Sequence, residues 1–320
     1  MPRPTAATTI QRPDLGALAY EYMLEASRRG FIGLNVMPVF PVPEQSSDFP
    51  IIPVESLLKI PDMKRAPRSG YARGDWKFTM GTYKCAQYGW EEPMDDVEAA
   101  LYERFFDAEA VSMEIATDHL IRGHEKRVAA KLFNTGNAIG NAAAAVLWST
   151  PATATPKADI KAAKTALRLA SGVNANAVVM SKSTFDNLMV TAELKTYMQY
   201  TTPHLLLGYD AQKQTVARYF EVDHVLVADA MEDTAKLGQA ASLGDIWRND
   251  YVSVSRIATS PNLKEPAFGR TFLWTRMSPG ILQAKTYREE KRDSTIYRVD
   301  HHTDEAIQFI GANYIITGVA

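Results

Sequence analysis

Between residues 94 and 133, apolar residues recur at the spacing of one face of an α-helix. The members of this face are Val97, Leu101, Phe105, Ala108, Val111 and Ile115. Pro93 suits a first helical turn, acidic residues follow it, and basic residues gather near the other end, as the helix dipole favours. No stop follows until Asn134 and Gly136. The pattern predicts one helix over 94–133, roughly 60 Å long at about 1.5 Å per residue.

The segment ahead of this helix has a different pattern. Six prolines between positions 38 and 61 interrupt β-prone residues, and central strands exclude proline because it removes a hydrogen-bond donor. Two β-prone runs, 49–60 and 76–90, flank a stretch rich in glycine, proline and basic residues. We therefore predict a long hairpin whose tip carries Lys64, Arg65, Arg68 and Arg73. Because a lone hairpin is barely stable in water, we expect a neighbouring subunit to support it.

The remaining chain mixes helices and strands. The sequence predicts a helix over 155–171, a buried strand over 176–181, and a helix over 181–189 that Ser181 caps. Further strands are expected within 217–232, 245–258, 268–277 and 280–319. The fold class is therefore α+β, with long antiparallel strands late in the chain.

We expect the first thirty residues to form an arm outside the folded body. Residues 1–14 are polar with three prolines, which is typical of an arm that orders against a partner. Residues 15–30 form a short amphipathic pattern that ends at Gly30. No apolar run suits a signal peptide or a membrane span, so we expect neither.

Composition narrows the function classes. The 320 residues are 46% hydrophobic and 22% charged, values that are typical of a globular protein. A net charge of −2 offers no basic surplus for nucleic-acid binding as the main role. A single cysteine excludes an internal disulfide framework and fits a reducing cytoplasm.

Candidate chemistry is sparse. Cys85 could be a nucleophile, but no histidine lies near it in the sequence, and a small packing residue is the favoured interpretation. His119 and His124 are five residues apart, which does not match the zinc-binding spacing. The acidic run of Glu91, Glu92, Asp95, Asp96 and Glu98 is best explained as a helix start. We therefore predict no catalytic residue, no metal site and no cofactor.

The order of these parts resembles the major capsid proteins of tailed double-stranded DNA phages, the Hong Kong 97-type fold. "YKCAQYGWEEPMDDVEAA" (83–100) resembles the end of that family's extended loop where it enters the spine helix. "NAVVMSKSTFDNLMVTAELKTYMQY" (176–200) is similar to the strand and helix that open the axial domain. "VARYFEVDHVLVADAMED" (216–233), "DIWRNDYVSV" (245–254) and "PAFGRTFLW" (266–274) resemble later parts. The resemblance spans roughly residues 20–320.

The resemblance implies a division of the chain. Its parts would be an N-terminal arm (1–35), an extended loop hairpin (36–92), a peripheral domain with the spine helix (93–173), an axial domain (174–265), and a strand-rich return (266–320) to both domains. It places Lys64, Arg65, Arg68 and Arg73 at the loop tip, as inter-subunit contacts. Cys85 would then be a packing residue where the hairpin meets the spine helix.

The resemblance also implies a role. The chain would be a structural subunit of an icosahedral capsid in the virion, assembled in the host bacterial cytoplasm. Its partners would be copies of itself in hexamers and pentamers, separate scaffolding and portal proteins, decoration proteins in some phages, and the packaged double-stranded DNA, bound without sequence specificity. No lysine–asparagine crosslink pair is assigned. An encapsulin-like compartment shell is the alternative, and a cytosolic enzyme with an unrecognised site is a third hypothesis.

Overall fold

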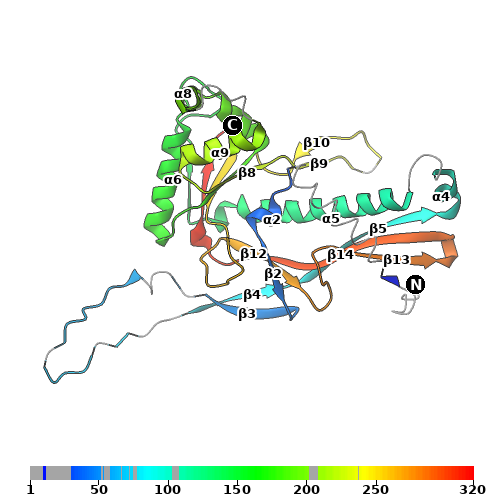
Figure 1. Cartoon of the computed structure of the whole chain (residues 1–320), viewed down its shortest axis with the longest axis horizontal. Coiled ribbons are helices and arrows are strands. Elements are labelled where there is room, and N and C mark those ends of the chain that lie inside the picture. Colours follow the sequence, from blue (N-terminus) through cyan, green and yellow to red (C-terminus); the bar gives the residue numbers. More distant parts are fainter. Residues whose placement is uncertain are drawn as a thin grey trace.

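The computed structural model describes residues 10–11, 30–51, 53, 58–65, 67–71, 73–74, 78–102, 108–201, 208–236 and 238–320. The predicted arm and the predicted helix over 15–30 lie outside these residues, apart from 10–11 and Gly30. Gly30 itself has a left-handed backbone, with φ of 79°. Within the described part, no helix is both long and apolar enough to span a membrane. Figure 1 shows an elongated molecule from which one long loop extends away from the body.

A six-stranded sheet is organised around β14 (Ser294–Ile307). Strand β5 (Ala86–Asp95) pairs along one side of β14, while β13 (Gln283–Glu289) and then β12 (Gly269–Trp274) pair along the other. The short strands β1 (Ile10–Gln11) and β2 (Val39–Val42) extend this sheet at β13 and β12. The predicted late antiparallel strands are therefore confirmed.

Helix α5 (Ala108–Leu132) lies along β5 and β14 as the longest helix of the described residues (Figure 1). Its 25 residues span about 38 Å. The prediction of one helix over 94–133 was wrong at its start: β5 continues to Asp95, and a separate helix, α4, covers Asp96–Tyr102. Pro93 lies in β5 opposite Ile296, not in a first helical turn. An edge strand accepts proline because its outward side needs no donor.

The predicted apolar face of this region was also mostly wrong, although its member Ala108 is buried. Val97 and Leu101 are 68% and 63% exposed, and Ile115 is exposed as well. Phe105 lies outside the described residues. The buried face of α5 instead contains Met113, Ala116, Leu120, Val128 and Leu132, together with the polar Ser112, Thr117, His124 and Glu125. The polar residues on the buried face obscured the pattern that an apolar count detects.

A second, five-stranded sheet has the order β6 (Gly140–Ala143), β15 (Asn313–Thr317), β11 (Tyr251–Ser255), β7 (Ala177–Ser181) and β8 (His224–Ala228). Its helices are α6 (Pro156–Ser171), α7 (Lys182–Val190), α8 (Ala192–Thr201) and α9 (Tyr209–Phe220). β15 brings the end of the chain into this sheet, where it pairs with both β6 and β11.

Local signals placed α6 and α7 correctly. Pro156 opens α6, and Gly172 ends it with a left-handed backbone of φ 71°. Ser181 ends the fully buried β7, and its hydroxyl accepts the backbone N–H of Thr184 at 3.3 Å, so it caps α7 as predicted.

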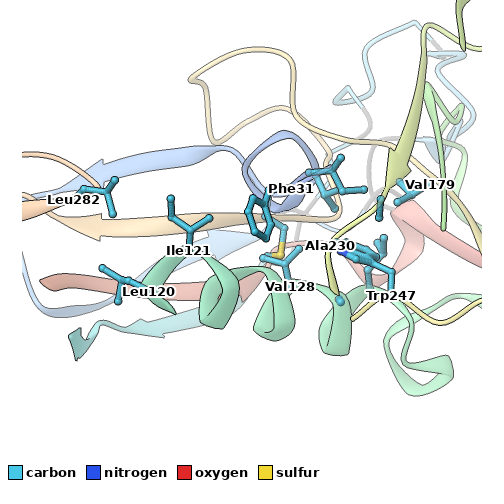
Figure 2. Close-up of a cluster of buried hydrophobic side chains, with 14 of the residues drawn as sticks. Phe31, Leu120, Ile121, Val128, Val179, Ala230, Trp247 and Leu282 are labelled. Atoms are coloured by element: carbon cyan, nitrogen blue, oxygen red, sulfur yellow. The ribbon is translucent and has the colours of Figure 1, made fainter. Parts of the chain in front are cut away.

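Two hydrophobic clusters hold the body together. The first packs α5 against the six-stranded sheet and includes Phe31, Ile121, Val128, Trp247 and Leu282 (Figure 2). The second lies between the five-stranded sheet and its helices and includes Trp148, Phe185 and Leu188. Trp148 and Trp247 are fully buried, so both are core residues.

Smaller elements complete the described chain. Strands β3 (Ser46–Ile51) and β4 (Thr79–Lys84) form one two-stranded sheet, and β9 (Met231–Asp233) and β10 (Leu243–Asp245) form another. The short helices are α2 (Gly33–Val36), η2 (Thr135–Asn137), η3 (Glu290–Arg292) and η4 (Ile310–Ala312). Pro41 lies in β2 at a sheet edge and Pro50 in β3, which confirms the edge interpretation of the proline-rich segment.

Candidate assembly surface

The predicted hairpin exists at its base and continues as an extended loop. β3 and β4 pair from Ser46 opposite Lys84 to Ile51 opposite Thr79. Every described side chain from 58 to 80 is exposed, including Thr79 and Met80 at the outer end of this ladder, and Figure 1 shows the loop leaving the body. Among its exposed residues are Leu58, Ile60, Met63, Tyr71, Phe78 and Met80. Soluble monomers rarely present so much apolar surface together, so the loop has the character of a surface that another chain covers.

The four predicted tip residues all lie in this loop and are exposed. Nε of Arg65 donates to the carbonyl of Ser69 at 2.7 Å, and its guanidinium lies 4.5 Å from the ring centre of Tyr71. Arg68 has a left-handed backbone, with φ of 69°. No ion pair joins Lys64, Arg65, Arg68 or Arg73 to another residue of the described part. The structure thus brings the four charges into one segment, in which the carboxylate of Asp62 accepts the backbone N–H of Lys64 at 2.9 Å but forms no ion pair with the four side chains.

An aromatic cluster anchors the base of the loop. The ring of Phe272 in β12 stacks on Tyr83 with centroids 4.6 Å apart and on Phe49 with centroids 5.4 Å apart. Backbone N–H of Lys84 donates to Asp304 Oδ2 at 2.9 Å. The loop therefore starts from a rigid platform that fixes its direction.

Cys85 belongs to this platform. It lies between β4 and β5, is 1% exposed, and its Sγ lies 3.6 Å from the carbonyl oxygen of Phe272. Burial raises the pKa of the thiol to about 11, and the nearby Asp304 and Glu305 charges add to the shift. A nucleophile needs a lowered pKa. Cys85 is thus a packing residue, but it packs where the hairpin meets the six-stranded sheet rather than at the spine helix.

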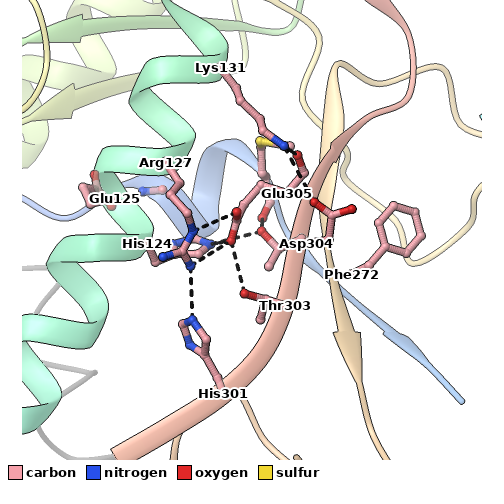
Figure 3. Close-up of polar contacts among 12 residues, drawn as sticks. His124, Glu125, Arg127, Lys131, Phe272, His301, Thr303, Asp304 and Glu305 are labelled. Carbon is pink, nitrogen blue, oxygen red and sulfur yellow. Dashed lines mark hydrogen bonds and ion pairs between the residues drawn. The ribbon is translucent and has the colours of Figure 1, made fainter. Parts of the chain in front are cut away.

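A buried polar network ties α5 to β14 (Figure 3). Arg127 forms two hydrogen bonds to Glu305, at 2.9 and 3.1 Å, and a third contact of 3.1 Å to Nε2 of His301. Lys131 donates to the backbone carbonyl of Glu305. Burial raises the pKa of Glu305, but Arg127 and the other nearby cationic groups outweigh it, so the net pKa is lowered and the carboxylate stays ionised.

Two histidines in this network are held neutral. His124 Nε2 lies 3.2 Å from Oγ1 of Thr271, which in turn donates to the carbonyl of Met37. Burial lowers the pKa of His124 to about 4, against the opposing charge of Glu305. The pKa of His301 is lowered to about 3, mainly by burial, with His124 and Arg127 adding to the shift and Glu305 opposing it. Neutral imidazoles here link α5, β12 and β14 without adding charge.

Glu125, on the same helix, holds the chain that enters the body at α2. Its carboxylate accepts the backbone N–H groups of Ile32 and Gly33 at 2.8 and 2.7 Å, and the indole N–H of Trp247 at 2.8 Å. Burial raises the pKa of Glu125 to about 7, although all three hydrogen bonds oppose the shift. A Cβ on Gly33 would meet the carboxylate at 2.6 Å, so this position requires glycine.

The sequence patterns did not predict structural roles for Glu125, Glu305, His124 and His301. A charged residue gives no sign in the sequence that it is buried, and the partners of Glu125 are 92 to 122 positions away. The acidic run was also only partly a helix start: Glu91 and Glu92 lie in β5, where Glu91 pairs with Arg298. Asp95 does accept the N–H of Val97 at 2.8 Å as α4 begins.

The polar network is suited to holding α5 against β14 rather than to catalysing a reaction. Its ionised groups are enclosed and paired with one another, and the two histidines are neutral. In the described part of the chain, no cluster of three histidine, cysteine or acidic residues could hold a metal ion. What the fold presents to the outside is the extended loop.

No family model and no curated protein sequence matches the chain. Solved structures do. A phage-related protein from Bordetella bronchiseptica RB50 aligns with a TM-score of 0.70 at 18% identity, over 97% of this chain and 98% of that chain. The capsid structure of cyanophage P-SCSP1u aligns with a TM-score of 0.56 at 11% identity, over 88% and 86%.

An encapsulin complex from Synechococcus elongatus PCC 7942 aligns with a TM-score of 0.52 at 8% identity, over 89% of this chain and 86% of that chain. All three alignments run over most of both chains, so they concern the whole architecture rather than one shared motif. The chain therefore has the α+β fold of Hong Kong 97-type phage capsid structures, which its sequence resemblance predicts.

Proposed function

We propose that this chain is the major capsid subunit of a tailed phage, a structural protein that assembles into hexamers and pentamers around double-stranded DNA. The observation that carries the proposal is the extended loop, whose described residues from 58 to 80 are all exposed and include six large apolar side chains. An element that buries nothing against its own chain gains stability only from another chain. The fold shared with phage capsid structures supports the same conclusion.

In this proposal each part has a mechanical role. Residues 1–35 are the arm and 36–92 the extended loop, both lent to neighbours. Residues 93–173 form the peripheral domain around α5, 174–265 form the axial domain, and 266–320 return to both. Scaffolding, portal and decoration proteins are the expected partners, and the virion, assembled in the bacterial cytoplasm, is the expected location.

We further propose that the loop tip pairs with carboxylates of a neighbouring subunit. The side chains of Lys64, Arg65, Arg68 and Arg73 have no acidic partner in the described part of their own chain. The start of α4 offers the exposed Glu98, close in sequence to Asp96, which already pairs with Arg288 at 2.7 Å. Each exposed pair contributes under about 1 kcal/mol, but the contact repeats around every capsomer.

Replacing all four tip residues with glutamine tests this pairing, with particle yield followed against ionic strength. Screening weakens exposed pairs, so the wild-type yield should fall with salt and the variant yield should be lower at low salt and flat. An unchanged yield with unchanged salt sensitivity would mean that the tip is an ordinary solvated loop.

The alternative of an encapsulin-like shell is favoured by one observation, the alignment with the Synechococcus encapsulin. The phage-related protein aligns better, with a TM-score of 0.70 against 0.52. Portal and terminase genes beside this gene would favour the phage role.

Size measurement of the purified protein, co-expressed with neighbouring phage genes, tests the proposed function itself. We expect capsomers or hollow particles. A stable native monomer near 35 kDa as the sole species would contradict the proposal and would revive the hypothesis of a cytosolic enzyme.

A further inference from the structure

Helix α6 carries a basic stripe on its exposed side. Lys157, Lys161, Lys164 and Arg168 follow one another at steps of four, three and four residues, so they lie on one face over about 16 Å. They border a groove of about 610 Å³ between α6 and the end of α9, together with Asn174, Tyr219 and Phe220. Figure 1 shows α6 on the outer flank of the five-stranded sheet.

Two of the four cations are fixed and two are free to bind. Nζ of Lys164 donates to the carbonyls of Phe220 and Glu221 at 2.9 and 2.8 Å, and Nζ of Lys157 lies 4.9 Å from the ring centre of Tyr219. The side chains of Lys161 and Arg168 form no ion pair or hydrogen bond with any residue that the structure describes.

The acidic residues near this stripe leave Lys161 and Arg168 without an ion pair in the described part of the chain. Glu193 in α8 lies at the Lys157 end, where its carboxylate accepts the backbone N–H of Lys157 at 3.5 Å. Asp159 on the same helix accepts the indole N–H of Trp148 at 3.0 Å and the N–H of Ala145 at 3.2 Å. Glu221 is the single carboxylate among the residues that line the groove. A chain of net charge −2 therefore concentrates positive charge on one helix face.

An apolar stripe runs directly beside the basic one. Leu169 is 83% exposed, and a shallow depression of about 510 Å³ is lined by Ala158, Lys161, Ala162, Thr165, Ala166 and Leu169. Lys161 borders both hollows. The small alanine side chains would let another backbone approach closely, and Leu169 would provide an apolar contact at one end.

We propose that this face of α6 docks an acidic amphipathic α-helix of a partner protein. Carboxylates at steps of four, three and four residues on a partner helix have the same spacing along the helix axis as the four basic side chains of α6. In an antiparallel pair of helices, each carboxylate can therefore lie opposite one cation. Apolar residues on the adjoining stripe of the partner would cover Leu169 and the alanines. A nucleic acid would use the cations but leave the apolar stripe exposed, so the combination favours a polypeptide.

The inference goes beyond the proposed function and does not depend on it, because binding is measured on the purified chain in any oligomeric state. The probe is a synthetic helical peptide with glutamates at the stated spacing and leucines on the adjoining stripe. Its controls are a scrambled peptide of the same composition and a short DNA duplex, each measured by fluorescence anisotropy.

We expect the peptide to bind, and the double variant Lys161→Glu/Arg168→Glu to weaken binding by roughly tenfold or more. Leu169→Ser should also weaken it, with less change in the salt dependence. A matched variant, Lys195→Glu/Lys264→Glu, reverses two exposed charges elsewhere and should leave binding unchanged.

Three outcomes would overturn the inference: no binding of the peptide, equal binding of the scrambled peptide, or equal loss in the matched variant. Tighter binding of the duplex, lost in Lys161→Glu/Arg168→Glu but retained in Leu169→Ser, would identify a nucleic-acid surface instead. Because all the substituted side chains are exposed, the variants should fold, and circular dichroism checks that they do.

Discussion

Ile60 and Met63 in the extended loop are 88% and 74% exposed, although both side chains are strongly apolar. If a neighbouring subunit covers them, changing both to serine should weaken assembly without weakening the fold. Full burial of such a side chain contributes about 1.5–3 kcal/mol, so the double variant should lose about 3 kcal/mol per subunit contact. Since about 1.4 kcal/mol corresponds to tenfold in an equilibrium constant, the concentration needed for assembly should rise by roughly a hundredfold.

Light scattering against protein concentration gives the assembly threshold, and thermal unfolding of dissociated subunits gives the stability. The stability should change by less than about 0.5 kcal/mol, because both side chains are on the surface. Leu243→Ser in β10 removes an exposed leucine elsewhere and serves as the control. An unchanged threshold for Ile60→Ser/Met63→Ser, or an equal rise for the control, would refute the claim that the loop carries the contact.

Buried groups of the body give three further predictions. His124 has a folded pKa of about 4, below its ordinary 6.5, so its protonation should lower stability as pH drops from about 6.5 to about 4, by up to about 1.4 kcal/mol per unit. Because His301, with a folded pKa of about 3, contributes in the same direction, His124→Gln should reduce this slope in urea titrations without abolishing it, and an unchanged slope would contradict the assignment. Glu125→Ala leaves three N–H donors without an acceptor, although it also removes the cost of burying the carboxylate. We expect the free energy of unfolding to fall by about 2 kcal/mol at pH 8. Equal unfolding midpoints of variant and wild type would show that the carboxylate is not needed. Cys85→Ser should preserve assembly with a modest loss of stability, and complete loss of function in a folded variant would revive the nucleophile hypothesis.

Short-range signals in the sequence were sufficient for α6, β7 and α7 of the second sheet and its helices. Pro156 and Gly172 bound α6, and the Ser181 cap separates β7 from α7, all within a few residues of the elements they define. These features depend on backbone geometry that a local pattern encodes. The hairpin base was predictable in the same way, from prolines that exclude a central strand.

Contacts between residues far apart in the sequence set the features that local patterns did not predict. The predicted β-prone run over 76–90 covers only part of β5. Residues 91–95 continue this strand because β14, some two hundred positions later, pairs with them, so the helix begins at Asp96 and not at residue 94. The buried face of α5 was mispredicted because Glu125 and His124 occupy it through partners on α2, β12 and β14. The loop tip could be located as a charge cluster, and in the proposed assembly the surface that receives it belongs to another chain.

Cryo-electron microscopy of particles from the co-expressed protein tests the central claim most directly. The account predicts closed shells in which the loop between β3 and β4 lies across a neighbouring subunit, with Ile60 and Met63 buried there. A protein that forms no shell, or a shell in which this loop folds back on its own chain or stays uncovered, would contradict it.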